Sequence, residues 1–284
     1  MQNNIRPELQ RSIIDSIIDL QYSLMYTYNA AQEKNKAKDA FWKHVYELYQ
    51  KDTDAFTKAT DDIIENKCDY LNTEEALIRL ECIGIFGKVP FYAWIFRLRA
   101  KLNIDITKTA SMLKSTLSQI RKRNDATAKF DIWTFNELLD DLASNSIYSE
   151  AAVERMLSVF DAAEIIDTEG AIAFVAIQSA RNNKNIPRKI SDVALIGREL
   201  AIISLDGLAA WYAQNGRSTV QKLKTALSNI GAKETANIFA KLSTVKQSDA
   251  NSLNEKLYAL ETELFDMFGK EDHDMLSRQY LINS

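Results

Sequence analysis

The sequence predicts an all-α protein, a multi-helix bundle. Of its 284 residues, 8 are glycine and 3 are proline, far fewer than a fold rich in β-turns would use. Apolar residues recur along the chain at the spacing of amphipathic helices. Strictly alternating apolar and polar runs, which mark half-buried strands, do not occur. We therefore expect helices joined by short polar connections.

In the first half of the chain, apolar residues at helical spacing mark successive segments. The polar stretch EKNKAKD (33–39) is interpreted as the connection between the first two helices. Asp52 or Thr53 is the expected N-cap of the third, because short polar side chains accept hydrogen bonds from the first backbone N–H groups. The expected helices cover residues 7–31, 41–49, 52–67, 72–85, 91–102 and 107–123.

The second half continues in the same way. Asp167 or Thr168 and then Ser191 are expected to cap helices, and Gly207 and Gly231 are expected to interrupt or end them. In the helix over 131–145, the side chains expected to point inward are Trp133, Leu138, Leu139 and Leu142. The expected helices cover residues 131–145, 149–163, 167–180, 191–205, 208–214, 219–230, 233–242, 252–268 and 272–281.

Two similar octapeptides raise the question of an internal duplication: LKSTLSQI at 113–120 and LKTALSNI at 223–230. In both halves an Ala-Phe pair, an Ala-Leu-Ile triplet and a tryptophan segment precede them. The expected organisation is an N-terminal helix (1–36), two helical subdomains (37–130 and 131–248) that are possible relatives, and C-terminal helices (249–284). Chance agreement between ordinary amphipathic helices is the alternative and stays open.

The composition argues against several classes of function. The formal net charge of −4 provides no global positive field that would attract nucleic acid. The two cysteines and two histidines (Cys68, Cys82, His44, His273) show no metal-ligand spacing, and no glycine-rich phosphate loop occurs, so no metal or cofactor is expected. No apolar run approaches the roughly 18 to 20 residues that span a bilayer, and no secretory signal is evident. A cytoplasmic location is expected.

The stretch from Asp206 to Phe239 carries a more specific pattern. A glycine turn at Gly207 is followed by the aromatic pair Trp211–Tyr212, the Asn215–Gly216 turn and the element ALSNIGA at 226–232. Over about residues 190–245 this pattern resembles the C-terminal domain of the bacterial DNA-mimic-protein-19 type, a domain of unknown function.

Two residues depart from the pattern of that family. Asp206 stands where the family usually has the first of two adjacent glycines, and Glu199 lies farther from the turn than the family's acid does. The resemblance implies an all-α structure without catalysis. It also implies binding to a transcription factor through carboxylates that stand in for phosphates, or a role as an interaction or immunity module.

Acidic residues are concentrated in two segments, 52–75 and 131–169, and they supply the candidate partner-binding residues. These are Asp52, Asp54, Asp61, Asp62, Glu65, Asp69, Asp131, Glu137, Asp140 and Asp141. They predict a non-enzymatic bacterial or phage protein that binds and inhibits a partner with a basic surface, such as a toxin, a nuclease or a DNA-binding regulator. No catalytic, metal-binding or cofactor-binding residue is assigned.

Three other interpretations of these charges stay open. They can form ordinary solvated helix faces. They can line the cleft of an enzyme between the two helical halves, which requires carboxylates from distant helices to converge on one pocket. The basic block over 97–123 can contact nucleic acid directly, although the acidic balance makes this the weaker alternative.

Overall fold

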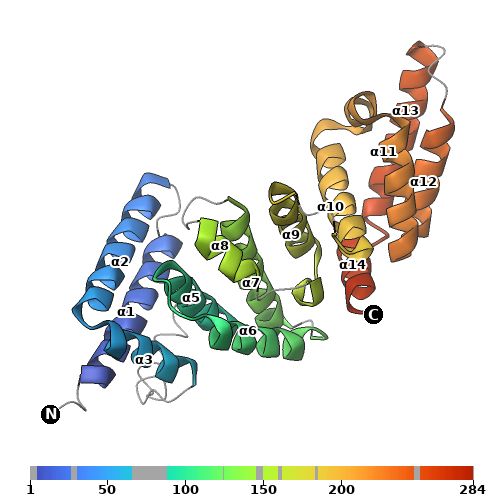
Figure 1. The fold of residues 1–284 in the computed structure, drawn as a ribbon. Coiled ribbons are helices and arrows are strands. Elements are labelled where there is room, and N and C mark those ends of the chain that lie inside the picture. Colours follow the sequence, from blue (N-terminus) through green and yellow to red (C-terminus); the bar gives the residue numbers. More distant parts are fainter. Residues whose placement is uncertain are drawn as a thin grey trace. The chain divides into compact units, whose positions relative to one another are not determined.

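The computed structural model describes residues 5–26, 31–65, 88–123, 125–144, 150–158, 162–182, 185–245 and 250–283. Within these ranges the chain is helical and contains no strand, which confirms the expected fold class (Figure 1). No helix in the described part is long and apolar enough to cross a membrane. The helix expected near residue 72, the cap at Ser149 and both cysteines lie outside the described residues.

The described part of the chain is a succession of helices. In chain order they are α1 (Ile5–Tyr26), α2 (Ala31–Lys51), α3 (Thr53–Ile64), α5 (Lys88–Lys101), α6 (Thr107–Ile120), α7 (Ala126–Ser144), α8 (Glu150–Leu157), a 3₁₀ turn (Ala162–Glu164), α9 (Thr168–Ala180), α10 (Arg188–Asp206), α11 (Leu208–Ile230), α12 (Lys233–Thr244), α13 (Ala250–Phe268) and α14 (His273–Ile282).

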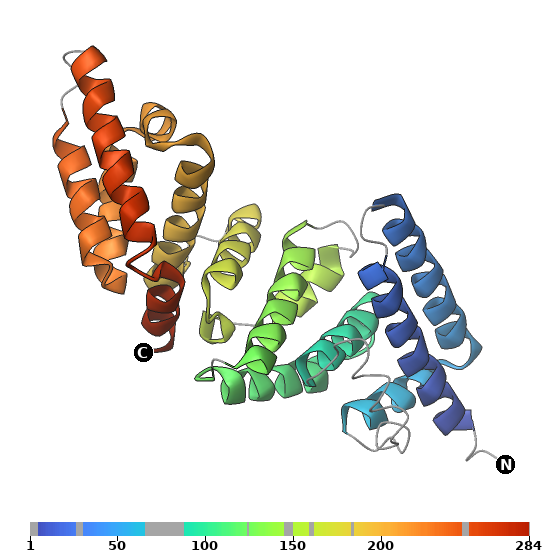
Figure 2. The same ribbon diagram turned by 180° about the vertical axis from the view of Figure 1, so that it is seen from behind.

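Contacts divide the chain into two compact units. Unit 1 comprises Met1–Leu138 and Asn145–Phe160, and unit 2 comprises Leu139–Ser144 and Asp161–Ser284. The two terminal segments expected to stand apart, 1–36 and 249–284, each pack into a unit. In unit 1, α1 lies against α2 and α3 (Figure 2). In unit 2, α13 lies against α11 and α12.

The stretch 33–39, expected as a connection, is instead part of α2. Lysine, glutamate and alanine dominate it, and all three are strong helix formers, so its polarity does not mark a loop. An ion pair between Lys36 Nζ and Glu33 Oε1, 2.8 Å apart and one turn apart on the helix, adds support. The N-terminal half of α2 is thus a polar helix rather than a turn.

Two of the expected helix caps are present, and one is not. Asp52 accepts a hydrogen bond from Ala55 N, and Asp167 accepts one from Gly170 N, each at 2.9 Å. α10 begins at Arg188, directly after Pro187, instead of at Ser191. The backbone of Pro187 is extended, with ψ at 137°, so the helix starts at the next residue and Ser191 already lies in its first turn.

Glycines with positive φ set the helix ends of unit 2. Gly207 (φ 84°) separates α10 from α11, and Gly231 (φ 89°) ends α11 in the left-handed conformation, as expected. The segments 208–214 and 219–230, expected as separate helices, form the single helix α11 with a kink at Gly216 (φ 66°). No turn of several residues separates them, because one glycine absorbs the change of direction.

A buried carboxylate anchors the core of unit 2. Trp211, fully buried, donates its indole N–H to Glu199 Oε2 at 2.7 Å, and Arg198 donates twice to Glu199 Oε1 at 2.9 and 2.7 Å. The Trp211 ring meets Phe239 edge-on at 5.9 Å between centroids. Trp211, on which the family resemblance drew, and Glu199, which departs from the family pattern, therefore both have a structural role here.

The order of elements keeps the duplication open without deciding it. The Ala-Phe pair lies on α3 in unit 1 and on α9 in unit 2, and the two octapeptides lie on α6 and α11. A positive-φ residue separates the tryptophan segment from the octapeptide in each half: Asn103 (φ 60°) and Gly216 (φ 66°). The Ala-Leu-Ile triplet of the first half lies outside the described residues, and the duplication stays a prediction.

Candidate functional site

The described part of the first acidic segment, residues 52–65, comprises α3 and its two caps, and the inner face of α3 buries Phe56, Ala59 and Ile63. Its acids gather towards the C-terminal end, where the helix dipole disfavours negative charge. Asp61, Asp62 and Glu65, at this end, each meet a cation from another part of unit 1. The ion pairs are Asp61–Arg99 (2.6 Å), Asp62–Arg6 (3.2 Å) and Glu65–Lys108.

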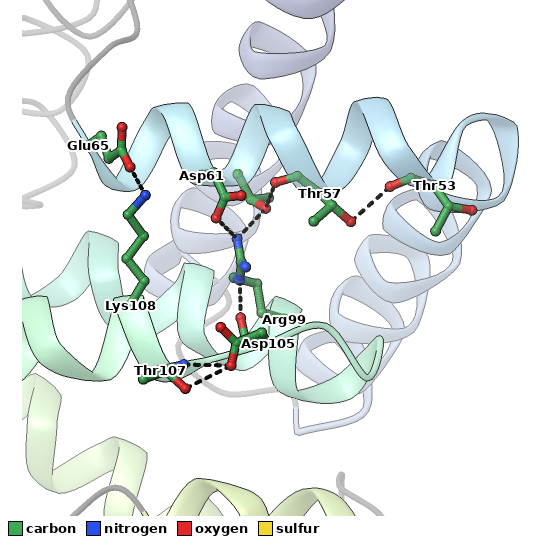
Figure 3. Close-up of polar contacts among 9 residues, drawn as sticks. Thr53, Thr57, Asp61, Glu65, Arg99, Asp105, Thr107 and Lys108 are labelled. Carbon is green, nitrogen blue, oxygen red and sulfur yellow. Dashed lines mark hydrogen bonds and ion pairs between the residues drawn. The ribbon is translucent and has the colours of Figure 1, made fainter.

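The guanidinium of Arg99, on α5, is the centre of this cluster (Figure 3). Arg99 is 2% exposed, and Nη1 donates to Thr60 Oγ1 at 3.0 Å and to Asp61 Oδ1 at 2.6 Å. Its Nε donates to the backbone carbonyl of Asp105 at 2.6 Å. A buried cation without partners would cost several kcal/mol, roughly, so these bonds are what allow it to lie there.

The same cluster fixes the start of α6. The Asp105 carboxylate accepts hydrogen bonds from Thr107 Oγ1 at 2.8 Å and Thr107 N at 3.2 Å (Figure 3). These bonds hold the pKa of the Asp105 carboxyl below its usual value. Arg99 also donates to the carbonyl of Asp105. One chain of hydrogen bonds therefore connects α3, α5 and the first turn of α6.

These contacts change the interpretation of the first acidic segment. Asp61, Asp62 and Glu65 face cations of their own chain. Asp52 is exposed and caps α3, and Asp54 is exposed in its first turn. Asp69 lies outside the described residues. Among the described carboxylates of this segment, Asp61, Asp62 and Glu65 hold parts of unit 1 together.

The candidate residues of the second acidic segment lie on α7, and the first of them, Asp131, is not on the surface. Asp131 is 3% exposed, and its Oδ1 has no hydrogen-bond partner among the described residues. Burial raises the pKa of its carboxyl to about 6, although the positive charge of Arg123 opposes the shift. The prediction that Asp131 binds a partner is therefore corrected, because a partner cannot reach this side chain without local opening of the fold.

Trp133, expected to point inward, is instead 47% exposed, whereas Leu138, Leu139 and Leu142 are buried as expected. The helical geometry explains the difference. At about 100° per residue, Trp133 lies about 180° around the helix from Leu142, so the leucines and Trp133 cannot share a face. A helical projection of the sequence alone is enough to show that Trp133 lies on the side opposite Leu142.

The exposed side of α7 carries two of the predicted carboxylates. Glu137 and Asp140 are exposed, and with Trp133 they have the i, i+4, i+7 spacing of one helical face. We call these three residues the α7 face. Lys129 is exposed one turn before Trp133, so the acids flank the indole on its C-terminal side. Asp141 lies in the same helix.

In unit 2, Glu271 joins the α13–α14 connection to the start of α12. Its carboxylate accepts from Glu234 N at 3.1 Å, Thr235 N at 3.0 Å and Thr235 Oγ1 at 2.6 Å, and His273 Nε2 lies 3.0 Å from Thr235 Oγ1. Burial would raise the pKa of Glu271, but these hydrogen bonds outweigh it and lower the pKa. Burial lowers the pKa of His273. Because Thr235 is fully buried, this group fastens helices together instead of presenting a nucleophile.

Each unit contains a cavity large enough for a small molecule. One, of about 690 Å³, lies in unit 2 beside α9, α10 and the α13–α14 connection. Two carboxylates at its edge have internal partners, since Asp274 accepts from Thr168 Oγ1 at 3.0 Å and Asp272 caps α14. The other, of about 540 Å³, lies in unit 1 beside α2 and the end of α5. Among the described residues, none of the predicted acids lines either cavity, and no cluster of His, Cys, Asp and Glu is arranged to hold a metal ion.

Comparison of the chain with protein-family models, with curated proteins and with solved structures gave no match. The resemblance over residues 190–245 therefore rests on the sequence pattern itself and stays a prediction.

We expect Arg99→Met to lower the free energy of unfolding by about 3–5 kcal/mol, because it leaves Thr60, the Asp61 carboxylate and the Asp105 carbonyl without their donor. Urea unfolding followed by far-ultraviolet circular dichroism measures the loss. Lys108→Met is the control, since it breaks a partly exposed pair and should cost at most about 1 kcal/mol. Equal, small losses for both variants would contradict the structural role of Arg99.

Asp131 predicts a pH dependence of stability. Its pKa of about 6 in the folded chain exceeds the roughly 3.9 of an unfolded aspartate, so the folded state binds more protons between these values. The stability that this group contributes is present below about pH 4 and is lost as the pH rises through about 6. Asp131→Asn, which stays neutral, should therefore be more stable than the parent by about 1–2 kcal/mol at pH 8.

The measurement is urea unfolding of both proteins from pH 4 to pH 8. The difference should shrink towards pH 4, where the parent carboxyl is protonated. The exposed Asp266, changed to Asn, serves as the matched control and should show no such trend. A difference between parent and Asp131→Asn that is constant over this range would show that Asp131 is not the titrating group.

Proposed function

We propose that this chain is a non-enzymatic protein-binding module that blocks or sequesters a partner with a basic surface. Toxin immunity and inhibition of a nucleic-acid-binding protein are two forms of this activity. The observation that supports the proposal is the α7 face, where the exposed indole of Trp133 lies beside the exposed carboxylates of Glu137 and Asp140.

This combination of side chains suits a protein interface. Tryptophan is enriched among the residues that dominate binding energy, because its large ring buries much apolar area with few rotatable bonds. Neighbouring carboxylates complement lysine and arginine on a partner, which raises the association rate and disfavours partners of the wrong charge. Trp133 is also an exposed tryptophan in a chain whose Trp94 and Trp211 are buried, so the core does not account for it.

The helix provides a firm base for this face. Its opposite side buries Phe135, Leu138 and Leu142. Side chains on a packed helix need little reordering on binding, and this lowers the entropy cost of forming a complex. Of the first acidic segment, Asp52 and Asp54 stay candidates for a further contact, since both are exposed.

The competing proposal of direct nucleic-acid binding has less support from the geometry. Within the basic block over 97–123, Arg97 and Arg99 are buried, at 4% and 2% exposed. Lys108 lies in an ion pair with Glu65. Phosphate binding requires cations that can reach the nucleic-acid backbone, and Arg97, Arg99 and Lys108 are engaged within the protein instead.

The test is a pull-down of the tagged full chain from the native host, quantified by mass spectrometry, with the variants Trp133→Ala and Glu137→Gln. We expect the recovery of a specific basic protein to fall about tenfold or more with Trp133→Ala and by less with Glu137→Gln, because the ring anchors the interface and one carboxylate contributes at its rim. Recovery with the parent should also fall as salt rises from about 50 to 300 mM, because the charges become screened.

Matched controls come from unit 2. Tyr258→Ala removes another exposed aromatic ring, and Glu255→Gln removes another exposed carboxylate. Both should leave recovery unchanged. If the controls reduced recovery as much as the α7 variants did, or if recovery did not respond to salt, binding through the α7 face would be refuted.

A further inference from the structure

The cavity of unit 1 has an aromatic wall on α2. Trp42, Tyr46 and Tyr49 line it and are spaced i, i+4, i+7, so they share one face of the helix. Trp42 packs edge-on against Phe41 at 5.2 Å between ring centroids, and Tyr49 packs edge-on against Phe56 at 5.6 Å. Two rings are thus held by the core, while Tyr46 is 51% exposed at the mouth.

Cations border the same cavity. Lys43 lines it from α2, and Lys101 lines it from the last residue of α5. The Lys101 ammonium lies 4.1 Å from the centroid of the Trp42 ring. Arg155 donates a hydrogen bond to Oδ1 of Asn103, which also lines the cavity, and so brings a third cation to this end. Asp39 is the nearby carboxylate that acts on Lys101, and it offsets part of this positive charge.

The environment of Lys101 favours an anion. Burial lowers the pKa of its amine, although the negative charge of Asp39 opposes the shift. An ammonium that has lost part of its hydration gains more from an anionic partner than a fully hydrated one does. With its Oδ1 bound to Arg155, Asn103 keeps an amide N–H₂ group that can donate to a ligand.

We propose that this cavity binds a small planar aromatic ligand that carries an anionic group, a phosphate or a carboxylate. The aromatic body packs against Tyr46 and Tyr49, and the anionic group lies between Lys43 and Lys101. The volume of about 540 Å³ is within the roughly 300–1,000 Å³ of small-molecule sites, and aromatic walls with a few placed polar groups are their usual lining. The site is independent of the α7 face, and either proposal can fail without the other.

The experiment is isothermal titration calorimetry of the full chain with two anionic probes, adenosine 5′-monophosphate and indole-3-acetate. Adenosine and indole are their neutral counterparts, and inorganic phosphate is the anion without an aromatic body. At least one anionic probe should bind saturably with a dissociation constant below about 1 mM. Its neutral counterpart, which lacks the anionic group, and inorganic phosphate, which lacks the aromatic body, should each bind at least about tenfold more weakly.

Two variants locate the site. Tyr46→Leu and Lys101→Met should each weaken the bound probe about tenfold or more, and far-ultraviolet circular dichroism checks that they fold. Lys51→Met, on an exposed residue of α2 outside the cavity, is the control and should bind as the parent does. If neither anionic probe bound below about 1 mM, if the neutral counterparts bound equally well, or if Tyr46→Leu and Lys101→Met bound like the parent, the proposal would be overturned.

Discussion

The hydrogen bonds of the buried Arg99 guanidinium are the interactions on which the rest of unit 1 depends. Arginine keeps its charge at every accessible pH, so once it is buried its hydrogen bonds must be made within the protein. Thr60, Asp61 and the carbonyl of Asp105 accept them, and α3, α5 and the start of α6 are held together as a result. The end of α5 is thereby placed, and with it Lys101 at the unit 1 cavity.

This constraint also divides the acidic residues by role. Asp61, Asp62 and Glu65 neutralise cations of their own chain, and their cost at the C-terminal end of α3 is offset by those pairs. The carboxylates of the α7 face are exposed beside Trp133. A net charge of −4 spread evenly would not identify an interface, so the proposed binding face is argued from the exposed ring of Trp133 and its two neighbouring acids.

Local patterns in the sequence predict what depends on neighbouring residues, and they miss what depends on distant ones. The fold class, the caps Asp52 and Asp167 and the stop at Gly231 involve residues a few positions apart. The Arg99–Asp61 pair spans 38 positions, and no periodicity encodes it. Two arginines inside the apolar segment FYAWIFRLRAKL were nevertheless a signal of buried cations. The burial of Asp131 was equally hidden, because its depth depends on how α7 packs.

The most direct test of the central claim is hydroxyl-radical footprinting of the full chain, free and in complex with a partner recovered from the host. We predict that oxidation of Trp133 falls strongly on binding, because the partner covers the α7 face. Oxidation of Tyr258, which is exposed on α13, should stay unchanged. Protection of Tyr258 with Trp133 still oxidised at its free rate would contradict the account and place the interface on unit 2.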